Sequence, residues 1–294
     1  MIPLCTWCPL WLICFCPITI DLTHQSPHAT ITLMITSAHN PKIQWLRNLQ
    51  NQSKFRRAEG AFVLEGVRLA EEALQAGWPA LLVLHCEGLS ERGQAAVAAF
   101  EQRGVPVEQA TPAAFKAASD TETPQGLLVA LKLQPLPLPG RLEFVLIPDG
   151  VRDPGNLGTL LRTAAAAGAQ AVLLPPGTAD AYAPKVLRAA MGAHFRLAVH
   201  TLDWAEIRQI VQTPEHPQQV YLADAAQGLP YTQADLTQPL ALIVGGEAAG
   251  ASEQALALTS QRLHIPMPGG MESLNAAVAA AILMFEVVRQ RAIH

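Results

Sequence analysis

The chain has 294 residues, half of them apolar, and a formal net charge of −4. This size supports a large buried core and favours about two domains. Because the chain as a whole is not a polycation, any nucleic-acid site has to be a local basic patch.

The first segment has an unusual composition. Four of the five cysteines, Cys5, Cys8, Cys14 and Cys16, lie there among Trp, Leu, Ile and Phe, with no histidine at ligand spacing, so we predict no metal site. Its apolar run lacks a basic start, contains prolines and is too short to span a membrane. We expect residues 1–33 to be a disordered or non-native extension, with no membrane attachment. The remaining chain holds only Cys86, which favours a reduced, cytoplasmic protein.

Residues 34–133 alternate helical patterns with short apolar runs, which predicts a small α/β domain. The expected helices are Pro41–Leu49, Glu65–Ala76, Glu91–Arg103 and Pro112–Ala118, and the expected strands are Leu81–Leu84, Val105–Val107 and Leu127–Leu131. Residues 134–141 follow, where proline alternates with other residues, and this pattern predicts an extended linker.

A local basic stripe occupies the start of this domain. No acidic residue occurs between Asp21 and Glu59, and the intervening cations of the stripe are Lys42, Arg47, Lys54, Arg56 and Arg57. The stripe either contacts RNA or is an ordinary solvated helix face. Trp45 and Phe55 correspondingly either stack on bases or belong to the core.

Residues 142–294 contain short, continuously apolar runs separated by helical patterns, which implies a mostly parallel sheet. The expected strands are Phe144–Ile147, Ala171–Leu174, Leu197–Val199, Val220–Leu222, Leu240–Val244 and Leu263–Ile265. Neither the dinucleotide-binding glycine fingerprint nor the P-loop sequence occurs. The last helix, from Ser273 as N-cap to Arg291, should be deeply packed through residues at core spacing: Leu274, Val278, Ala281, Ile282, Phe285 and Val288.

Two segments place polar groups directly after a predicted strand, where open α/β sheets bind ligands. In the first, the turn Asp153–Asn156 leads into a helix that carries Arg162 among apolar neighbours. That guanidinium either pairs with a carboxylate or faces a phosphate or oxyanion. In the second, Gly245-Gly246-Glu247 either admits a ligand to the backbone or simply turns the chain.

The third informative segment, Ile265–Asn275, combines two prolines and two adjacent glycines immediately before the last helix. Exposed amides at a helix start can bind a polar ligand, although the same residues are also typical of a strand-to-helix turn.

In this order, the three segments resemble the three motifs of the SpoU, or TrmH, family of RNA ribose 2'-O-methyltransferases in the SPOUT superfamily. The resemblance spans Leu142 to Arg291. Upstream, Ser37–Asn51, Gly60–Glu72 and Thr123–Gly126 are similar to the substrate-binding domain of rRNA-directed members. Ala248 and Ala190 depart from the residues most frequent at their positions, but neither is an expected catalytic side chain.

The resemblance implies an α/β fold in which residues 142–294 form a SPOUT trefoil-knot domain with a mostly parallel sheet. Residues 34–133 would be the RNA substrate-binding domain. The cofactor would be S-adenosyl-L-methionine, and the chain would form a homodimer that shares Arg162 between subunits. The implied cofactor contacts are Gly245, Ile265 and Leu274, with Gly246, Met267 and Gly269 nearby.

The resemblance also makes Arg162 the central catalytic candidate. Because the pKa of arginine lies above about 12, we expect it to orient the phosphate and stabilise the nascent alkoxide rather than act as a base. The expected positioning residues are Asn156, Glu247, Ser273 and Asn275. His194 and His264 lie in apolar strand-like contexts and are expected to be structural. The predicted function is ribose 2'-O-methylation of 23S rRNA; the alternatives are a tRNA methyltransferase and a non-catalytic RNA-binding homologue.

Overall fold

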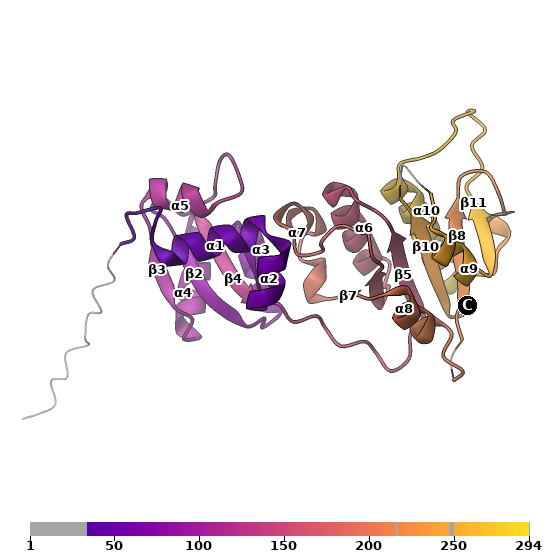
Figure 1. The fold of residues 1–294 in the computed structure, drawn as a ribbon, viewed down its shortest axis with the longest axis horizontal. Helices are drawn as coiled ribbons and strands as arrows, with labels where there is room; N and C mark the ends of the chain where they lie inside the picture. Colours follow the sequence, from indigo (N-terminus) through magenta and orange to yellow (C-terminus); the bar gives the residue numbers. More distant parts are fainter. Residues whose placement is uncertain (1–33, 216, 247–249, 294) are drawn as a thin grey trace, which may run out of the picture. The chain divides into compact units, whose positions relative to one another are not determined.

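The computed structural model describes residues 34–215, 217–246 and 250–293. The predictions for residues 1–33 and for Glu247 lie outside the described residues. The described chain contains a four-stranded sheet followed by a seven-stranded sheet, each covered by helices (Figure 1). The predicted α/β class is confirmed. Residues 133–143, which join the two sheets, contain neither helix nor strand.

The first sheet has the strand order β1-β4-β2-β3, in which β4 runs antiparallel to both of its neighbours and β3 runs parallel to β2. Its strands are β1 Ala61–Glu65, β2 Ala80–His85, β3 Val107–Gln109 and β4 Leu127–Lys132. Its helices are α1 Pro41–Asn51, α2 Ser53–Glu59, α3 Val67–Gln75, α4 Glu91–Gln102 and α5 Pro112–Ala118. Apolar side chains of α1 and α5 pack on one face of the sheet, and those of α3 and α4 pack on the other.

The predicted helix Glu65–Ala76 was wrong at its start. Glu65 instead ends β1, and Gly66, with φ of 105°, separates that strand from α3. A side chain other than glycine rarely adopts this φ, so the helix cannot extend back through it. The short apolar run before Glu65 forms a strand that the sequence pattern did not distinguish from helix.

The second sheet has the order β7-β6-β5-β10-β8-β11-β9, and every pair of neighbours is parallel. This confirms the predicted mostly parallel sheet. The strands are β5 Phe144–Asp149, β6 Ala171–Leu174, β7 Ala198–Thr201, β8 Gln219–Asp224, β9 Leu229–Pro230, β10 Leu240–Gly245 and β11 Gln261–His264. Only β9 among them was not expected from the sequence.

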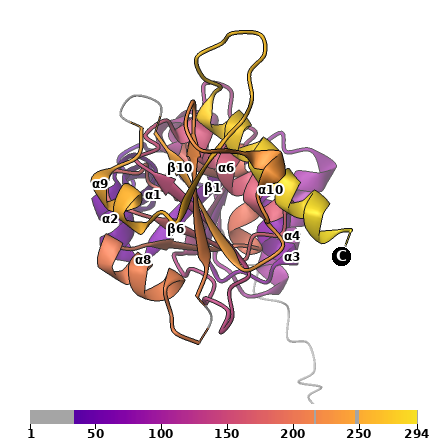
Figure 2. The ribbon, with the colours of Figure 1, turned by 90° about the vertical axis from the view of Figure 1, so that its right-hand side faces the viewer.

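Helices cover both faces of this sheet, with α10 on one side and α8 and α9 on the other (Figure 2). Consecutive strand residues therefore enter different cores: Val244 packs with α6 and α10, whereas Ile243 packs with α8 and α9. The helices are α6 Pro154–Ala166, α7 Pro184–Ala190, α8 Trp204–Val211, α9 Glu253–Leu258 and α10 Ala276–Arg291, with 3-10 turns at Ala193–Phe195 and Tyr231–Gln233. Burial on both faces explains why the strand sequences are apolar without alternation.

The orientation of the last helix differs from the prediction. Val278 and Phe285 are 50% and 49% exposed, and Leu274 is also exposed, whereas Ala280, Leu283 and Met284 are buried. Both sides of α10 are apolar, so its spacing alone could not identify the inward side. The helix is packed against the sheet through small and aliphatic residues, and a second apolar side is left outward.

The packing of α6 on α7 depends on Gly158. A β-carbon at Gly158 would lie 2.7 Å from the carbonyl oxygen of Val186 and would overlap the side chain of Ala189. The two helices can therefore approach this closely only because residue 158 has no side chain.

We predict that Gly158→Ala destabilises the protein by about 1–3 kcal/mol, because overlap with backbone outweighs the better helix propensity of alanine. Urea unfolding measures the change, and Thr159→Ala, at an exposed position of the same helix, is the control. An unchanged or increased free energy of unfolding for Gly158→Ala would contradict the close packing.

His194 is buried, and its Nε2 lies 2.8 Å from the carbonyl oxygen of Ala181, to which it donates as a neutral ring. Burial lowers the pKa of His194 to about 4, against smaller opposing effects of the Ala181 carbonyl and Asp180. Its ring also packs beside Tyr182. His194 therefore has the structural role expected from its sequence context.

Between pH 6.5 and 4 the unfolded chain binds a proton at His194 that the folded chain does not bind, so stability falls as the pH falls through this window. At pH 5 the loss is on the order of 2 kcal/mol relative to pH 7. Urea unfolding of the native protein and of His194→Gln at both values measures it. The variant should lose less stability than the native protein; equal losses would refute the assignment.

Candidate functional site

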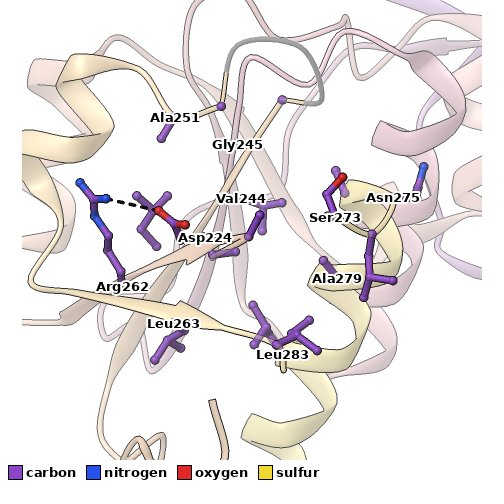
Figure 3. A pocket seen from close by; sticks show the side chains of 18 of the residues that line it. Asp224, Val244, Gly245, Ala251, Arg262, Leu263, Ser273, Asn275, Ala279 and Leu283 are labelled. Carbon is purple, nitrogen blue, oxygen red and sulfur yellow. Dashed lines mark hydrogen bonds and ion pairs between the residues drawn. The ribbon is translucent and has the colours of Figure 1, made fainter. Parts of the chain in front are cut away.

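A cavity of about 660 Å³ lies at the carboxyl ends of β8, β10 and β11, beside the start of α10 (Figure 3). The strand order reverses between β5 and β10, next to the cavity. The chain adds β6 and β7 on one side of β5 and then places β8 and β10 on the other side of β5. Such a reversal opens a crevice at the carboxyl ends of parallel strands. The location is the one that the sequence motifs indicated.

Five of the six expected cofactor contacts line this cavity: Gly245, Gly246, Ile265, Met267 and Leu274. Gly269 does not line it. The wall also contains apolar side chains of Val244, Leu263 and Leu283. The cavity therefore combines glycine backbone with apolar side chains, and both are common in the walls of small-molecule sites.

The two glycines also allow the chain to approach itself. A β-carbon at Gly246 would overlap the carbonyl oxygen of Gly150, and one at Gly245 would lie 2.8 Å from the carbonyl carbon of Gly250. Nearby, the buried carboxylate of Asp149 accepts a hydrogen bond of 2.6 Å from the amide of Ser252, the N-cap of α9. The glycines thus bring the ends of β5 and β10 and the segment before α9 together around the cavity.

Asn275, and not Ser273, is the N-cap of α10. Its side-chain oxygen accepts from the amides of Ala277 at 2.9 Å and Val278 at 3.2 Å. Ser273 is exposed and lines the cavity two residues earlier. The predicted cap was therefore displaced by two residues, because the chain after the glycines stays non-helical through Asn275.

Asn275 also connects the cavity to the motif on α6. Its Nδ2 donates to the side-chain oxygen of Asn156 at 3.1 Å. Asn156 is held in turn by the start of α6, where the carboxylate of Asp153 caps the helix by accepting from the amide of Asn156 at 2.8 Å. Two residues that are 119 positions apart in sequence thus form one amide pair beside the cavity.

Arg162 does not join this pair within the same chain. It lies six residues after Asn156 on α6, which places it about 9 Å further along the helix and about 120° around it. It is exposed and does not line the cavity. Within the part of the chain that the structure describes, no carboxylate pairs with Arg162, so the ion-pair alternative is not realised there.

Sequence reasoning missed two charged residues of the cavity wall, Asp224 and Arg262. The Asp224 carboxylate accepts from the amides of Ala226 at 3.0 Å and Gln227 at 2.9 Å, and from Arg262 Nη1 at 3.3 Å. Partial burial acts to raise the pKa of Asp224, but these amides and the guanidinium outweigh it and hold the pKa below its usual value. The available signal was an aspartate at the carboxyl end of a predicted strand.

Four of the five predicted RNA contacts, Lys42, Arg47, Lys54 and Arg57, are exposed. Lys42 forms an ion pair with Glu108. The fifth, Arg56, is only 4% exposed, and its guanidinium donates to the carboxylate of Asp180 and to the carbonyl oxygens of Leu49 and Gln50. The guanidinium of Arg56 is therefore not accessible to RNA. The exposed basic stripe consists of the other four cations.

The aromatic residues beside the stripe pack into the protein. Trp45 and Phe55 contact the core between α1, α5 and the first sheet, and Trp45 Nε1 donates to Glu59 at 2.8 Å. Over the described ranges, no group of three His, Cys, Asp or Glu residues could hold a metal ion. Over the same ranges, no helix is long and apolar enough to cross a bilayer.

The segments that form the two sheets each match a known protein family. Residues 143–285 match the SpoU rRNA Methylase family, and residues 40–129 match the MRM3-like substrate binding domain. Over 253 residues the chain is 35% identical to the 23S rRNA (guanosine(2553)-2'-O)-methyltransferase RlmP of Bacillus subtilis, which covers 86% of this chain and 98% of that protein. It is 34% identical over 300 residues to the mitochondrial rRNA methyltransferase 3 of Homo sapiens. That alignment covers 80% of this chain and 69% of the human protein.

Among solved structures, the SpoU methyltransferase AviRb from Streptomyces viridochromogenes, in complex with the cofactor AdoMet, superposes with a TM-score of 0.78 at 29% identity. The match covers 86% of this chain and 98% of that one. Relatives above 30% identity thus align over most of both chains. Two of the three sequence motifs line one cavity, and the first is joined to it by the Asn156–Asn275 hydrogen bond. The chain belongs to the SpoU rRNA methylase family.

Proposed function

We propose that this protein transfers a methyl group from S-adenosylmethionine to a ribose 2'-hydroxyl of large-subunit ribosomal RNA. The observation that carries the proposal is the cavity at the strand ends with the Asn156–Asn275 amide pair beside it. The similarity to a methyltransferase named for 23S rRNA and to an AdoMet-bound structure supports the substrate class and the cofactor.

The residues of the cavity fit S-adenosylmethionine. The backbone around Gly245 and Ile265 can hydrogen-bond an adenine edge, and Leu263 and Leu283 offer apolar surface to its faces. When bound, the cofactor supplies an electrophilic methyl group on a sulfonium. Its reactive end would face Ser273 and Asn275, because these polar groups lie on the side of the cavity that adjoins α6.

The reaction would form a bond between the ribose oxygen and the methyl carbon and break the carbon–sulfur bond, whose electron pair would stay on the sulfur of the product S-adenosylhomocysteine. The hydroxyl proton would pass to water. The amide pair would hold the ribose in line with that bond, which contributes through orientation. Arg162 would neutralise the adjacent phosphate and the charge that develops on the oxygen. Glu247, Ser273, Asn156 and Asn275 remain proposed positioning residues.

A homodimer would complete this site. The outward side of α10 carries Val278, Ile282 and Phe285 at spacings of four and three residues, and these form one continuous apolar stripe. Such a stripe is stabilised when a second copy covers it. Because Arg162 lies on a different side of α6 from Asn156, we propose that it serves the cavity of the partner subunit.

The remaining parts of the proposal concern RNA and topology. We propose that residues 34–133 bind the RNA substrate, with Lys42, Arg47, Lys54 and Arg57 contacting phosphates. Residues 142–294 would form the knotted catalytic domain, in which the Ile265–Asn275 segment makes the last crossing, and residues 134–141 would link the two. The proposed location is the cytoplasm, where a bacterial-type ribosome is assembled.

Two alternatives differ in the acceptor or in the chemistry. A tRNA-directed enzyme would share the cavity, but the match of residues 40–129 to an rRNA methyltransferase's substrate binding domain favours rRNA. A non-catalytic RNA-binding homologue would not need the amide pair or an exposed Arg162.

Native protein with S-adenosylmethionine should methylate ribose in 23S rRNA and not in tRNA, both taken from cells that lack the gene. Arg162→Ala should lower the rate by about 10²-fold or more while cofactor affinity by calorimetry stays unchanged. Arg208→Ala, at an exposed position of α8, is the control.

Methylation of tRNA alone would favour the first alternative. Cofactor binding without methylation of either RNA would favour the second. A folded Arg162→Ala protein with full activity would remove this residue from the mechanism.

The shared site predicts complementation between inactive variants. Asn275→Asp keeps an acceptor for the α10 cap but removes the donor to Asn156, so it should be inactive and folded. When this variant is mixed with Arg162→Ala and the subunits exchange, half of the dimers are heterodimers. Each heterodimer has one site with both a native Asn275 and a native Arg162, so the mixture should recover about one quarter of native activity. No recovery after confirmed exchange would place Arg162 and Asn275 of one chain in the same site. Adding Phe285→Asp to both variants places a charge in the apolar stripe of the proposed dimer interface. This change should prevent dimer formation and therefore abolish the recovery of activity.

A further inference from the structure

The cavity has a charged wall opposite the amide pair. Figure 3 shows Asp224 and Arg262 on one side and Ser273 and Asn275 on the other, with Val244 and Gly245 between them. Asp224 and Arg262 come from the adjacent parallel strands β8 and β11, and Arg262 lies beside Leu222 in their register. Their side chains share the face that carries α9, whereas Val244 and Leu263 share the face that carries α10.

The Asp224 carboxylate is held rigidly but is incompletely used. One oxygen, Oδ1, accepts from two backbone amides at 2.9 and 3.0 Å, so its position is fixed by the turn that follows β8. The other, Oδ2, has one long contact of 3.3 Å with Arg262 Nη1, while the same nitrogen donates to Gln227 Oε1 at 2.7 Å. The carboxylate is 22% exposed and borders the cavity. An ionised oxygen in this position has free acceptor capacity.

S-adenosylmethionine offers three kinds of donor to such an oxygen: the ribose diol, the adenine amino group and the α-ammonium group. The guanidinium of Arg262 already balances the charge of Asp224, which reduces its attraction for an ammonium ion. Hydroxyl groups need an acceptor but no net charge. A carboxylate at the carboxyl end of a parallel strand is also a general solution for holding ribose hydroxyls.

The position of the reacting groups also indicates that the ribose diol is the donor that faces Asp224. The sulfonium is bonded directly to the ribose 5' carbon, so a methyl group that faces Asn275 leaves the ribose between the two walls. Its diol can then point away from the amide pair. The opposite wall is the one that carries Asp224.

We propose that Asp224 Oδ2 accepts hydrogen bonds from the ribose hydroxyls of the cofactor, and that Arg262 is a positioning residue that holds this carboxylate in place. The inference rests on the proposed use of S-adenosylmethionine. It assigns to Asp224 the selection of a ribonucleoside cofactor over analogues that lack the diol. An analogue without the diol would leave the carboxylate without a donor, and an unpaired polar group in a binding site is a strong source of such discrimination.

Calorimetric binding of S-adenosylhomocysteine and of its 2',3'-dideoxyribose analogue tests the assignment without catalysis. The native protein should prefer the diol by about tenfold or more, as a hydrogen bond to a charged group provides. Asp224→Ala should weaken S-adenosylhomocysteine binding and bring the two affinities close to equality. Arg262→Gln should reduce the preference partially. Asp203→Ala removes another carboxylate that accepts from a backbone amide, that of Glu206 at the cap of α8, and should leave the preference unchanged.

The outcomes distinguish a failure of the proposed cofactor use from a failure of the role assigned to Asp224. If the folded native protein binds neither ligand, cofactor use itself fails. If the native protein binds and Asp224→Ala retains the native preference for the diol, the assignment of Asp224 is overturned. If Asp224→Ala instead changes only the ratio of S-adenosylhomocysteine to 5'-methylthioadenosine, the carboxylate serves the amino-acid end and the assignment is also overturned. Circular dichroism monitors folding, and should Asp224→Ala fail to fold, Asp224→Asn, which retains an acceptor for both amides, replaces it with the same expected loss of preference.

Discussion

The site depends on the close approach of backbone to backbone at the end of β10. Gly246 lies against Gly150, and Gly245 lies against Gly250, at separations that leave no room for a β-carbon. These contacts join the segments that follow two strands, β5 and β10, so that backbone groups and apolar side chains form the wall of one cavity. A side chain at either glycine would force these segments apart. The shape of the proposed cofactor cavity is therefore set by main-chain packing more than by any single polar side chain.

The parallel sheet could be predicted because helices cover both of its faces, which makes its strands continuously apolar and easy to recognise. The direction in which α10 faces could not be predicted in the same way. Its apolar residues surround the helix, and only the position of the sheet decides that Met284 is inward and Phe285 outward. The start of α10 was missed by two residues because both Ser273 and Asn275 are good capping residues, and the geometry of the preceding loop selects Asn275.

At the site, Asn156, Gly245 and Asn275 were accessible to sequence reasoning because each lies in a short segment with unusual composition. Asp224 and Arg262 were not, since their pairing joins two strands that are 38 residues apart and neither segment is distinctive alone. The burial of Arg56 shows the same difficulty: its partner Asp180 lies 124 residues away. A local charge pattern records which cations exist, but long-range packing decides which of them remain at the surface.

The two apolar sides of α10 connect folding with association. The inward side, with Leu283 and Met284, stabilises the single chain, while Val278 and Phe285 are half exposed and do not belong to that chain's buried core. In the proposed dimer their burial adds free energy only when a second copy is present, so the measured stability increases with protein concentration. Dilution would therefore lower the unfolding temperature without any change in sequence. For the proposed dimer, a melting temperature has a defined meaning only together with the concentration at which it was recorded.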